Sequence, residues 1–194
     1  MGDLNAAFEE AKQGYEFALR YTRQYPHLAS APALLLAMMR YERNETAEAT
    51  RLIDEYLTQS RGGFIDQLSA GYVTRSKIFQ LDNKHEMAFD LLSKGLSVAS
   101  ERGLDRLKQY LLEEQFRLLL VTGEIAKLKK LAASEGMSLV WTDYFPSVTS
   151  TTRDERRALA WVHAYSLSEP GGAIALTKRW REKLSRSGAL GARL

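Results

Sequence analysis

The stretch 40-RYERNETAEATRLIDEYL-57 decides the fold, because it holds the end of one helix, a short corner and the start of another. Apolar residues on both sides of the corner recur at the three- and four-residue spacing of a helix. Asn44 lies at the corner, and the helix after it places Ala49 and Leu52 on one face. The stretch therefore predicts two helices that fold back on each other.

The same corner recurs along the chain: "RNETAEATRLI" aligns with "LDNKHEMAFDLL", "TGEIAKLKKLA" and "SEPGGAIALTKRW". The small or apolar residue early in each second helix falls, at spacings of 39, 40 and 45, on Ala49, Ala88, Leu128 and Ala173. A period near 40 in helix–corner–helix units is typical of a tetratricopeptide-like α-solenoid. We therefore predict an all-α fold, a right-handed superhelix of about four and a half antiparallel helix pairs whose first helices line the concave side.

The recurring small residue has a physical reason. Alanine near the corner lets the two helices of a pair approach closely, and a leucine three residues later, at Leu52, Leu91 and Leu131, is expected to fill the space behind it. Leu128 departs from this pattern, because it places a large side chain at the position of the alanine.

Nine helices are expected within a single domain, residues 1–194. Their predicted ranges are 3–26, 30–43, 45–60, 64–81, 85–103, 104–122, 124–136, 152–168 and 173–188. Gly63 and Gly103 are expected to close second helices, and the same period separates them. The stretch 137–151 is the one long connection without helical periodicity.

Composition excludes several classes of protein. The chain has no cysteine, so disulfides, thiolate chemistry and cysteine zinc sites are excluded. Its start has no signal-peptide pattern, and no apolar run is long enough to span a bilayer. We expect a soluble, cytoplasmic protein without membrane association. The net charge of +3 is spread among mixed charges, with one basic stretch at 178–186 that we interpret as a solvated helix face.

No motif of an enzyme is present: there is no phosphate loop, GxGxxG, HExxH or GxSxG, and His27, His85 and His163 are far apart in sequence. Paired carboxylates such as Glu9 and Glu10 are expected to form salt bridges on the surface. The sequence therefore favours a protein that is not an enzyme and carries no cofactor or metal site.

Polar and aromatic residues on the first helices are the candidate ligand-binding residues, because binding sites combine apolar walls with a few hydrogen-bonding groups. They are Tyr72, Arg75, Phe79, Gln109, Glu113, Phe116, Arg117, Trp161 and Tyr165. The alternative is that the aromatic members belong to the core of the repeats. The connecting segment 140-VWTDYFP-146 either covers one end of the groove or packs back on the helices.

At these corners the chain resembles the helical-repeat region of MalT-like regulators, which are ATP-dependent transcriptional activators with a LuxR-type DNA-binding domain. The resemblance covers residues 32–136 and rests on the corner Arg40–Asn44, the glycines Gly62 and Gly63, the corner Asp82–Asn83 and the turn Arg117–Glu124. In that family the region receives a small-molecule inducer or a regulatory protein and relays the signal to ATP-driven oligomerisation.

The resemblance implies an effector-sensing or partner-binding domain, with self-association as a further option and no direct contact with nucleic acid. The chain has neither the phosphate loop nor a helix-turn-helix module, and it stops where another repeat would begin, so we expect a fragment of a longer regulator. The alternatives are a stand-alone tetratricopeptide-like scaffold that binds a peptide or protein and, more remotely, a nucleic-acid-binding array that uses the basic stretch 178–186.

Overall fold

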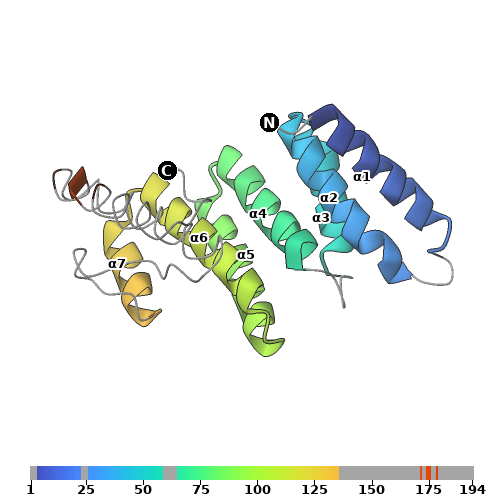
Figure 1. Ribbon diagram of the computed structural model, residues 1–194. Helices are drawn as coiled ribbons and strands as arrows, with labels where there is room; N and C mark the ends of the chain where they lie inside the picture. The colour runs from blue at the N-terminus through green and yellow to red at the C-terminus, as the bar shows by residue number, and fades with distance from the viewer. Residues whose placement is uncertain are drawn as a thin grey trace. The chain divides into compact units, whose positions relative to one another are not determined.

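The computed structural model describes residues 4–22, 26–58 and 65–135, together with the helical positions Gly171, Ile174, Ala175 and Lys178. In the three continuous ranges it contains one 3-10 helix, seven α-helices and no strand (Figure 1). In chain order these are α1 (Leu4–Leu19), η1 (Pro26–Ala29), α2 (Ser30–Glu42), α3 (Thr46–Tyr56), α4 (Ile65–Leu81), α5 (His85–Glu101), α6 (Asp105–Val121) and α7 (Ile125–Ser134). The prediction of an all-α fold is confirmed for this part of the chain.

The predicted ends of the first and third helices are wrong. Helix α1 ends at Leu19 instead of continuing to Pro26, because the chain tightens there into a turn with a hydrogen bond from Tyr21 N to Ala18 O (3.0 Å). Pro26 begins η1, a position where its missing N–H group costs no hydrogen bond. Helix α3 ends at Tyr56 and not at Ser60. The predicted helices at 152–168 and 173–188 lie outside the described residues, apart from the four single positions.

Three of the four predicted corners lie within the continuously described ranges, and they share one backbone geometry. A residue with positive φ ends each first helix, with angles of 65°, 58° and 72° at Asn44, Asn83 and Gly123. In each corner the next N–H group donates back over the turn, from Glu45 to Arg40 O, from Lys84 to Phe79 O and from Glu124 to Leu119 O, each at 2.8 Å. This is the Schellman motif, and its recurrence at the predicted positions confirms the repeat of the corner.

The turn between α5 and α6 has the same form. Gly103 takes a φ of 64°, and Leu104 N donates to Ala99 O at 2.8 Å. The predicted role of Gly103 is therefore confirmed, whereas Gly63 lies outside the described residues. The chain closes helices with the same motif both within a pair and between pairs.

The small position after each corner is buried as predicted, since Ala49, Ala88 and Leu128 have no exposed surface. The leucines predicted to fill the space behind it differ from one another: Leu52 is buried, but Leu91 and Leu131 are only half-buried. The consistently buried residues lie four positions after the small one, at Ile53, Leu92 and Ala132. The first two pairs have alanine at the small position and a large residue four positions later. The third pair has the reverse order, with Leu128 followed by Ala132.

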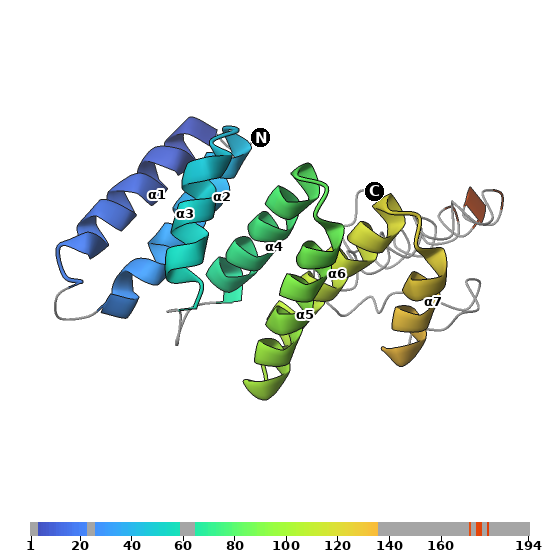
Figure 2. The ribbon, with the colours of Figure 1, turned by 180° about the vertical axis from the view of Figure 1, so that it is seen from behind.

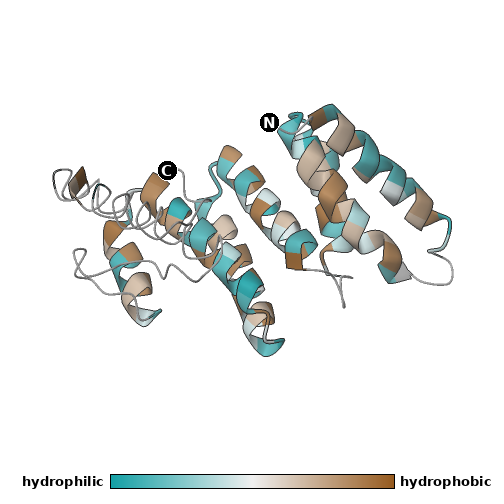
Figure 3. Ribbon diagram, in the orientation of Figure 1, coloured by the Kyte–Doolittle hydropathy of each residue, from teal (hydrophilic) through white to brown (hydrophobic). Residues whose placement is uncertain are grey.

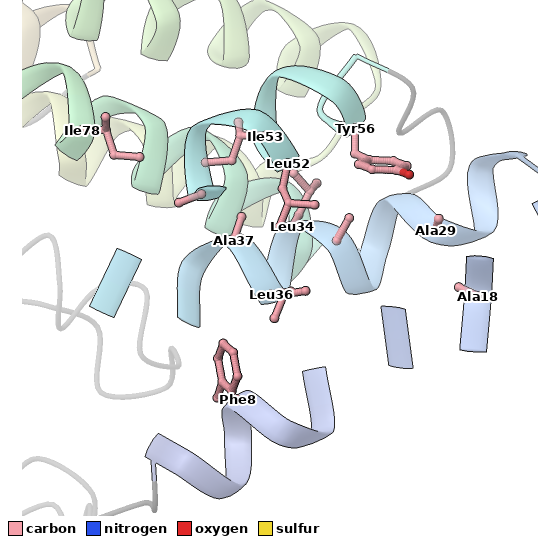
Figure 4. Packing of buried hydrophobic residues seen from close by; sticks show 12 residues of the cluster. Phe8, Ala18, Ala29, Leu34, Leu36, Ala37, Leu52, Ile53, Tyr56 and Ile78 are labelled. Carbon is pink, nitrogen blue, oxygen red and sulfur yellow. The ribbon is translucent and has the colours of Figure 1, made fainter. Parts of the chain in front are cut away.

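Helix α2 lies at the centre of the first core. It packs against α1, α3 and α4, and its Ala33, Leu34 and Ala37 have no exposed surface (Figures 1 and 2). Figure 4 shows Leu52 and Ile53 of α3 meeting this face of α2. The ribbon of α2 is accordingly mostly hydrophobic, while α1 alternates between hydrophilic and apolar bands (Figure 3).

Two contacts attach α1 to the first helix pair. Phe8 points toward α2 (Figure 4), and the guanidinium carbons of Arg40 and Arg43 lie 5.4 and 4.2 Å from its ring centroid. Further along, the hydroxyl groups of Tyr15 and Tyr56 are 3.2 Å apart and their rings meet edge to face. Burial and these hydrogen bonds raise the pKa of Tyr56 far above its ordinary value, so its phenol stays neutral.

Packing divides the chain into two compact units, Met1–Leu111 and Leu112–Leu194, with the boundary inside α6. The first unit has the core around α2 described above, and α4 packs against both α2 and α5. The second unit contains the end of α6 and α7, where Phe116, Leu118 and Leu128 are buried. No helix in the described ranges combines the length and apolar character that crossing a membrane requires.

Candidate partner-binding surface at the start of helices α4 and α6

Tyr72, a predicted ligand-binding residue on α4, packs against α5. Only 8% of it is exposed, and its ring atoms lie 3.0 and 3.1 Å from where a Cβ on Gly95 would stand. A glycine is therefore required at this crossing to make room for the ring. Burial raises the pKa of Tyr72, with a smaller opposing effect from Arg102. Its observed role is in packing, and its contact with a ligand stays a prediction.

Arg75 and Phe79 come together as predicted, but Arg75 is directed at α3. Its guanidinium lies 4.3 Å from the Phe79 ring centroid and binds both carboxylate oxygens of Asp54 at 3.0 Å. A third bond of 3.2 Å runs from Arg75 Nη1 to Thr50 Oγ1. The two-pronged pair matches guanidinium and carboxylate geometry, so Arg75 links α4 to the second helix of the preceding pair.

The predicted residues in the second half of α6 differ in exposure. Phe116 is 1% exposed and belongs to the core of the second unit. Arg117 is 41% exposed, and its Nε donates to Glu114 Oε2 at 2.8 Å. Arg117 thus supplies an opposite charge to the Glu114 carboxylate, which is largely buried. Glu113 is half-buried. The four predicted residues of α6 therefore do not form a single uniformly accessible face.

Gln109, near the start of α6, is the predicted residue whose chemistry points to a ligand. It is 8% exposed, and its side-chain Oε1 is buried without a hydrogen-bond donor among the described residues. Gln67, near the start of α4, likewise holds a buried Oε1 with no donor in the part of the chain that the structure describes. A buried carbonyl oxygen without a partner is costly, so each of these atoms has an unused capacity to accept a hydrogen bond.

Charged groups lie close to these two glutamines in sequence. Arg106 Nη2 lies 3.1 Å from Asp66 Oδ1 and 3.4 Å from the Tyr110 hydroxyl, and its guanidinium carbon lies 5.8 Å from the Tyr110 ring centroid. The Asp66–Arg106 pair brings the first turns of α4 and α6 together. Both side chains remain more than half exposed, so the pair is accessible to solvent and to a partner.

We call the five residues at this end of the first unit the α4–α6 polar surface: Asp66, Gln67, Arg106, Gln109 and Tyr110. Its carboxylate and amide oxygens accept hydrogen bonds, its guanidinium donates them, and its tyrosine ring offers an apolar contact. This combination suits a ligand or peptide that presents N–H or O–H groups. In the described ranges, no group of three or more His, Asp or Glu residues could hold a metal ion.

Sequence reasoning missed Asp66, Gln67, Arg106 and Tyr110. A usable signal was present, because one period of the repeat separates Asp66 from Arg106, so the two occupy equivalent positions in successive first helices. Opposite charges at equivalent positions of two such helices can pair with each other, as Asp66 and Arg106 do. Trp161 and Tyr165 lie outside the described residues, as do the segment 140–146 and most of the basic stretch 178–186.

The chain is similar to serine/threonine-protein kinase PknK from Mycobacterium tuberculosis and from Mycobacterium bovis. The identity is 36% over 117 residues, which make up 60% of this chain and 10% of each kinase. The chain thus spans about a tenth of the length of these relatives. No family model and no solved structure matches it.

Proposed function

We propose that this chain is the effector-sensing or partner-binding domain of a bacterial regulatory protein of the MalT-like, LuxR-type kind. The observation that carries the proposal is the α4–α6 polar surface, where Gln67 and Gln109 hold buried oxygens without donors among the described residues. A protein tolerates the cost of such atoms where a ligand or partner satisfies them. On this proposal the domain binds and does not catalyse.

The proposed architecture is a tetratricopeptide-like solenoid. Support comes from the corner motif, which recurs with the same hydrogen bond at Asn44, Asn83 and Gly123, close to the regular interval that a helical repeat requires. Such arrays present the first helices of successive pairs side by side as an extended binding surface. The α4–α6 polar surface lies on two first helices, as this architecture would require.

The similarity to a segment of a protein kinase supports a regulatory role. The resemblance in sequence is to transcriptional activators, whereas the relative is named as a serine/threonine-protein kinase and is matched over only a tenth of its length. We infer that a helical region shared by proteins with different activities is the part that receives a signal. The proposed mechanism is a population shift between two conformations of the domain. A ligand favours the conformation that it binds more tightly, and the size of the shift is set by the difference between its two affinities.

The test replaces Gln109 by leucine, which removes the unpaired oxygen and keeps the volume. We expect Gln109→Leu to raise the free energy of unfolding by about 1 kcal/mol, because a buried acceptor without a donor is removed. The same variant should lose the response to ligand, measured as the rise in melting temperature that a metabolite or peptide panel produces in the unmodified chain.

Gln115→Leu is the matched control. Gln115 is on the same helix and 2% exposed, but it takes part in an interaction, so its replacement should lower stability. A loss of stability in Gln109→Leu as large as that in Gln115→Leu would contradict the proposal, and so would an unchanged ligand response.

The alternative function is a stand-alone scaffold for a peptide or protein, which the same surface would also serve. The gene distinguishes the two: a reading frame that includes a phosphate loop before this region and a helix-turn-helix after it supports the regulator. A frame limited to the helical array supports the scaffold. Whether the region binds small molecules or proteins is decided by which members of the panel raise the melting temperature.

A further inference from the structure

The ion pair between Asp66 and Arg106 leaves polar atoms unused on both side chains. Arg106 Nη2 lies 3.1 Å from Asp66 Oδ1 and 3.4 Å from the Tyr110 hydroxyl. Among the described residues, Nε and Nη1 of Arg106 and Oδ2 of Asp66 have no further partner. By contrast, the guanidinium of Arg75 engages both carboxylate oxygens of Asp54. The Asp66–Arg106 pair therefore keeps unused donors and an unused acceptor.

Gln109 adds a second unused acceptor on the same face of α6. Arg106 and Gln109 are three positions apart, so they share a face of the helix, and Arg106 reaches Asp66 of α4 from that face. On α4 the equivalent residue is Ser69, whose hydroxyl donates to Asp66 O at 2.9 Å and so is not used by Gln109. Gln109 is only 8% exposed, and its Oε1 has no donor in the described ranges. An unpaired buried oxygen thus lies one helical turn from the unused donors of Arg106.

The unused atoms match the two charged groups of a zwitterion. The second oxygen of Asp66 and the oxygen of Gln109 can both accept from an ammonium group, which has three N–H donors. The unused N–H groups of Arg106 can donate to a carboxylate. Asp66 and Arg106 are together neutral, so a ligand that carries both charges adds no net charge to the surface, whereas a singly charged ligand does.

We propose that this surface binds a free α-amino acid with an apolar side chain. The ammonium of the ligand binds Asp66 and the Gln109 oxygen, and its carboxylate binds Arg106. Its side chain packs on the ring of Tyr110, whose centroid lies 5.8 Å from the Arg106 guanidinium carbon. The inference rests on the proposed function, because it names the class of ligand for a surface already proposed to bind one. We call Asp66, Arg106, Gln109 and Tyr110 the amino-acid site, and all four belong to the first unit.

The exposure of the ion pair makes the site accessible. The side chains of Asp66 and Arg106 are 59% and 57% exposed, so solvent screens their attraction and the contact is weak. In the proposed complex the two side chains move apart far enough to uncover the Gln109 oxygen. That oxygen then gains the donor that it lacks among the described residues, so binding replaces a weak contact with stronger ones.

Isothermal titration calorimetry of the full chain tests the ligand class, with L-phenylalanine and L-leucine as the probes. We expect at least one of the two to bind. The N-acetyl derivative of that amino acid lacks the ammonium and its amide lacks the carboxylate, so each should bind at least tenfold more weakly. Failure of both free amino acids to bind would overturn the proposal, and so would equal binding of either derivative.

Two nearly isosteric variants test the residues. Arg106→Gln and Asp66→Asn each neutralise one charge, so each should weaken binding of the amino acid at least tenfold, with little change in the melting temperature of the ligand-free chain. Arg51→Gln is the matched control, because Arg51 is 54% exposed and also pairs with carboxylates, but on α3. The control should bind normally. Unchanged binding in either test variant, or an equal loss in the control, would overturn the assignment of the site.

The same measurements separate a failure of this inference from a failure of the proposed function. If the free amino acids do not bind, but another member of the ligand panel raises the melting temperature of the unmodified chain and not of Gln109→Leu, the amino-acid site is wrong and the proposed function is supported. If the amino acid binds Gln109→Leu as tightly as the unmodified chain, Gln109 takes no part in binding, and both proposals are contradicted.

Discussion

At the scale of single residues, the corners depend on a backbone conformation that most L-amino acids rarely adopt. Asn44 and Asn83 take φ angles of 65° and 58°, and Gly123 takes 72°. Glycine reaches this region without steric cost, and asparagine is among the other residues that tolerate it best. The identities of the residues at the three corners are therefore explained by the backbone and not by a ligand.

Replacing the corner asparagines by glycine should stabilise the protein. We expect Asn44→Gly and Asn83→Gly each to raise the free energy of unfolding by about 0.5 kcal/mol, because the strain of a side chain at positive φ is removed. Gly123→Ala should lower it by about 1 kcal/mol for the opposite reason. Urea denaturation measures all three, and a destabilised Asn83→Gly variant would show that the asparagine side chain itself stabilises its corner.

At the scale of helices, large and small residues alternate across the helix pairs. In the register of the corners, Ala33 on α2 and Tyr56 on α3 correspond to Tyr72 on α4 and Gly95 on α5. All four are buried, so the second pair carries its large ring on the first helix and the first pair carries it on the second. In the second pair the Tyr72 ring lies in the space left by Gly95, whereas in the first pair the Tyr56 ring meets Tyr15 of α1.

The two helical glycines Gly95 and Gly14 should respond to the same substitution in opposite directions. A Cβ on Gly95 would lie 2.7 Å from Leu111 Cδ1 and 3.0 Å from the Tyr72 ring, so Gly95→Ala should destabilise the protein by about 1–2 kcal/mol. Gly14→Ala should stabilise it by up to about 1 kcal/mol, because its nearest contact is an ordinary 3.7 Å. Thermal unfolding in dilute solution compares the two, and equal shifts would contradict the packing at Gly95.

The bridge between Arg75 and Asp54 should stabilise the contact between α3 and α4. Arg75 is 16% exposed but Asp54 is 56% exposed, so solvent screens the pair and we expect a coupling of about 1 kcal/mol. A double-mutant cycle with Arg75→Ala and Asp54→Ala measures it. A coupling near zero would show that Asp54 does not hold Arg75, and Arg75 would then be available to bind a ligand.

At the scale of the whole molecule, each helix of the first unit packs only against its near neighbours. Helix α2 contacts α1, α3 and α4, whereas α1, within the described part of the chain, packs against η1 and α2 and meets α3 through Tyr15 and Tyr56. Regions with few packed neighbours open locally at a lower free-energy cost than the core does.

Amide hydrogen exchange should follow this gradient. We expect the amides of α2 to exchange most slowly and those of α1 to exchange faster, because opening α1 disrupts fewer contacts. Mass spectrometry of peptides from the two helices measures the difference.

The sequence by itself determined the order of the helices, the corners and the regular interval between them. These features follow from local chemistry: apolar spacing within one helix, and asparagine or glycine where φ is positive. They also allowed the first helices to be predicted as the carriers of a binding surface, with Gln109 among its residues, and this stays a prediction.

Only the tertiary structure decided which side of each helix meets which neighbour. Tyr72 and Arg75 are close in sequence and share a face of one helix, yet Tyr72 packs on α5 and Arg75 binds α3. The same information leaves Phe17 of α1 59% exposed. Helical periodicity relates residues of one helix to one another, whereas the rotation of a helix against its neighbours depends on how side chains distant in sequence interlock.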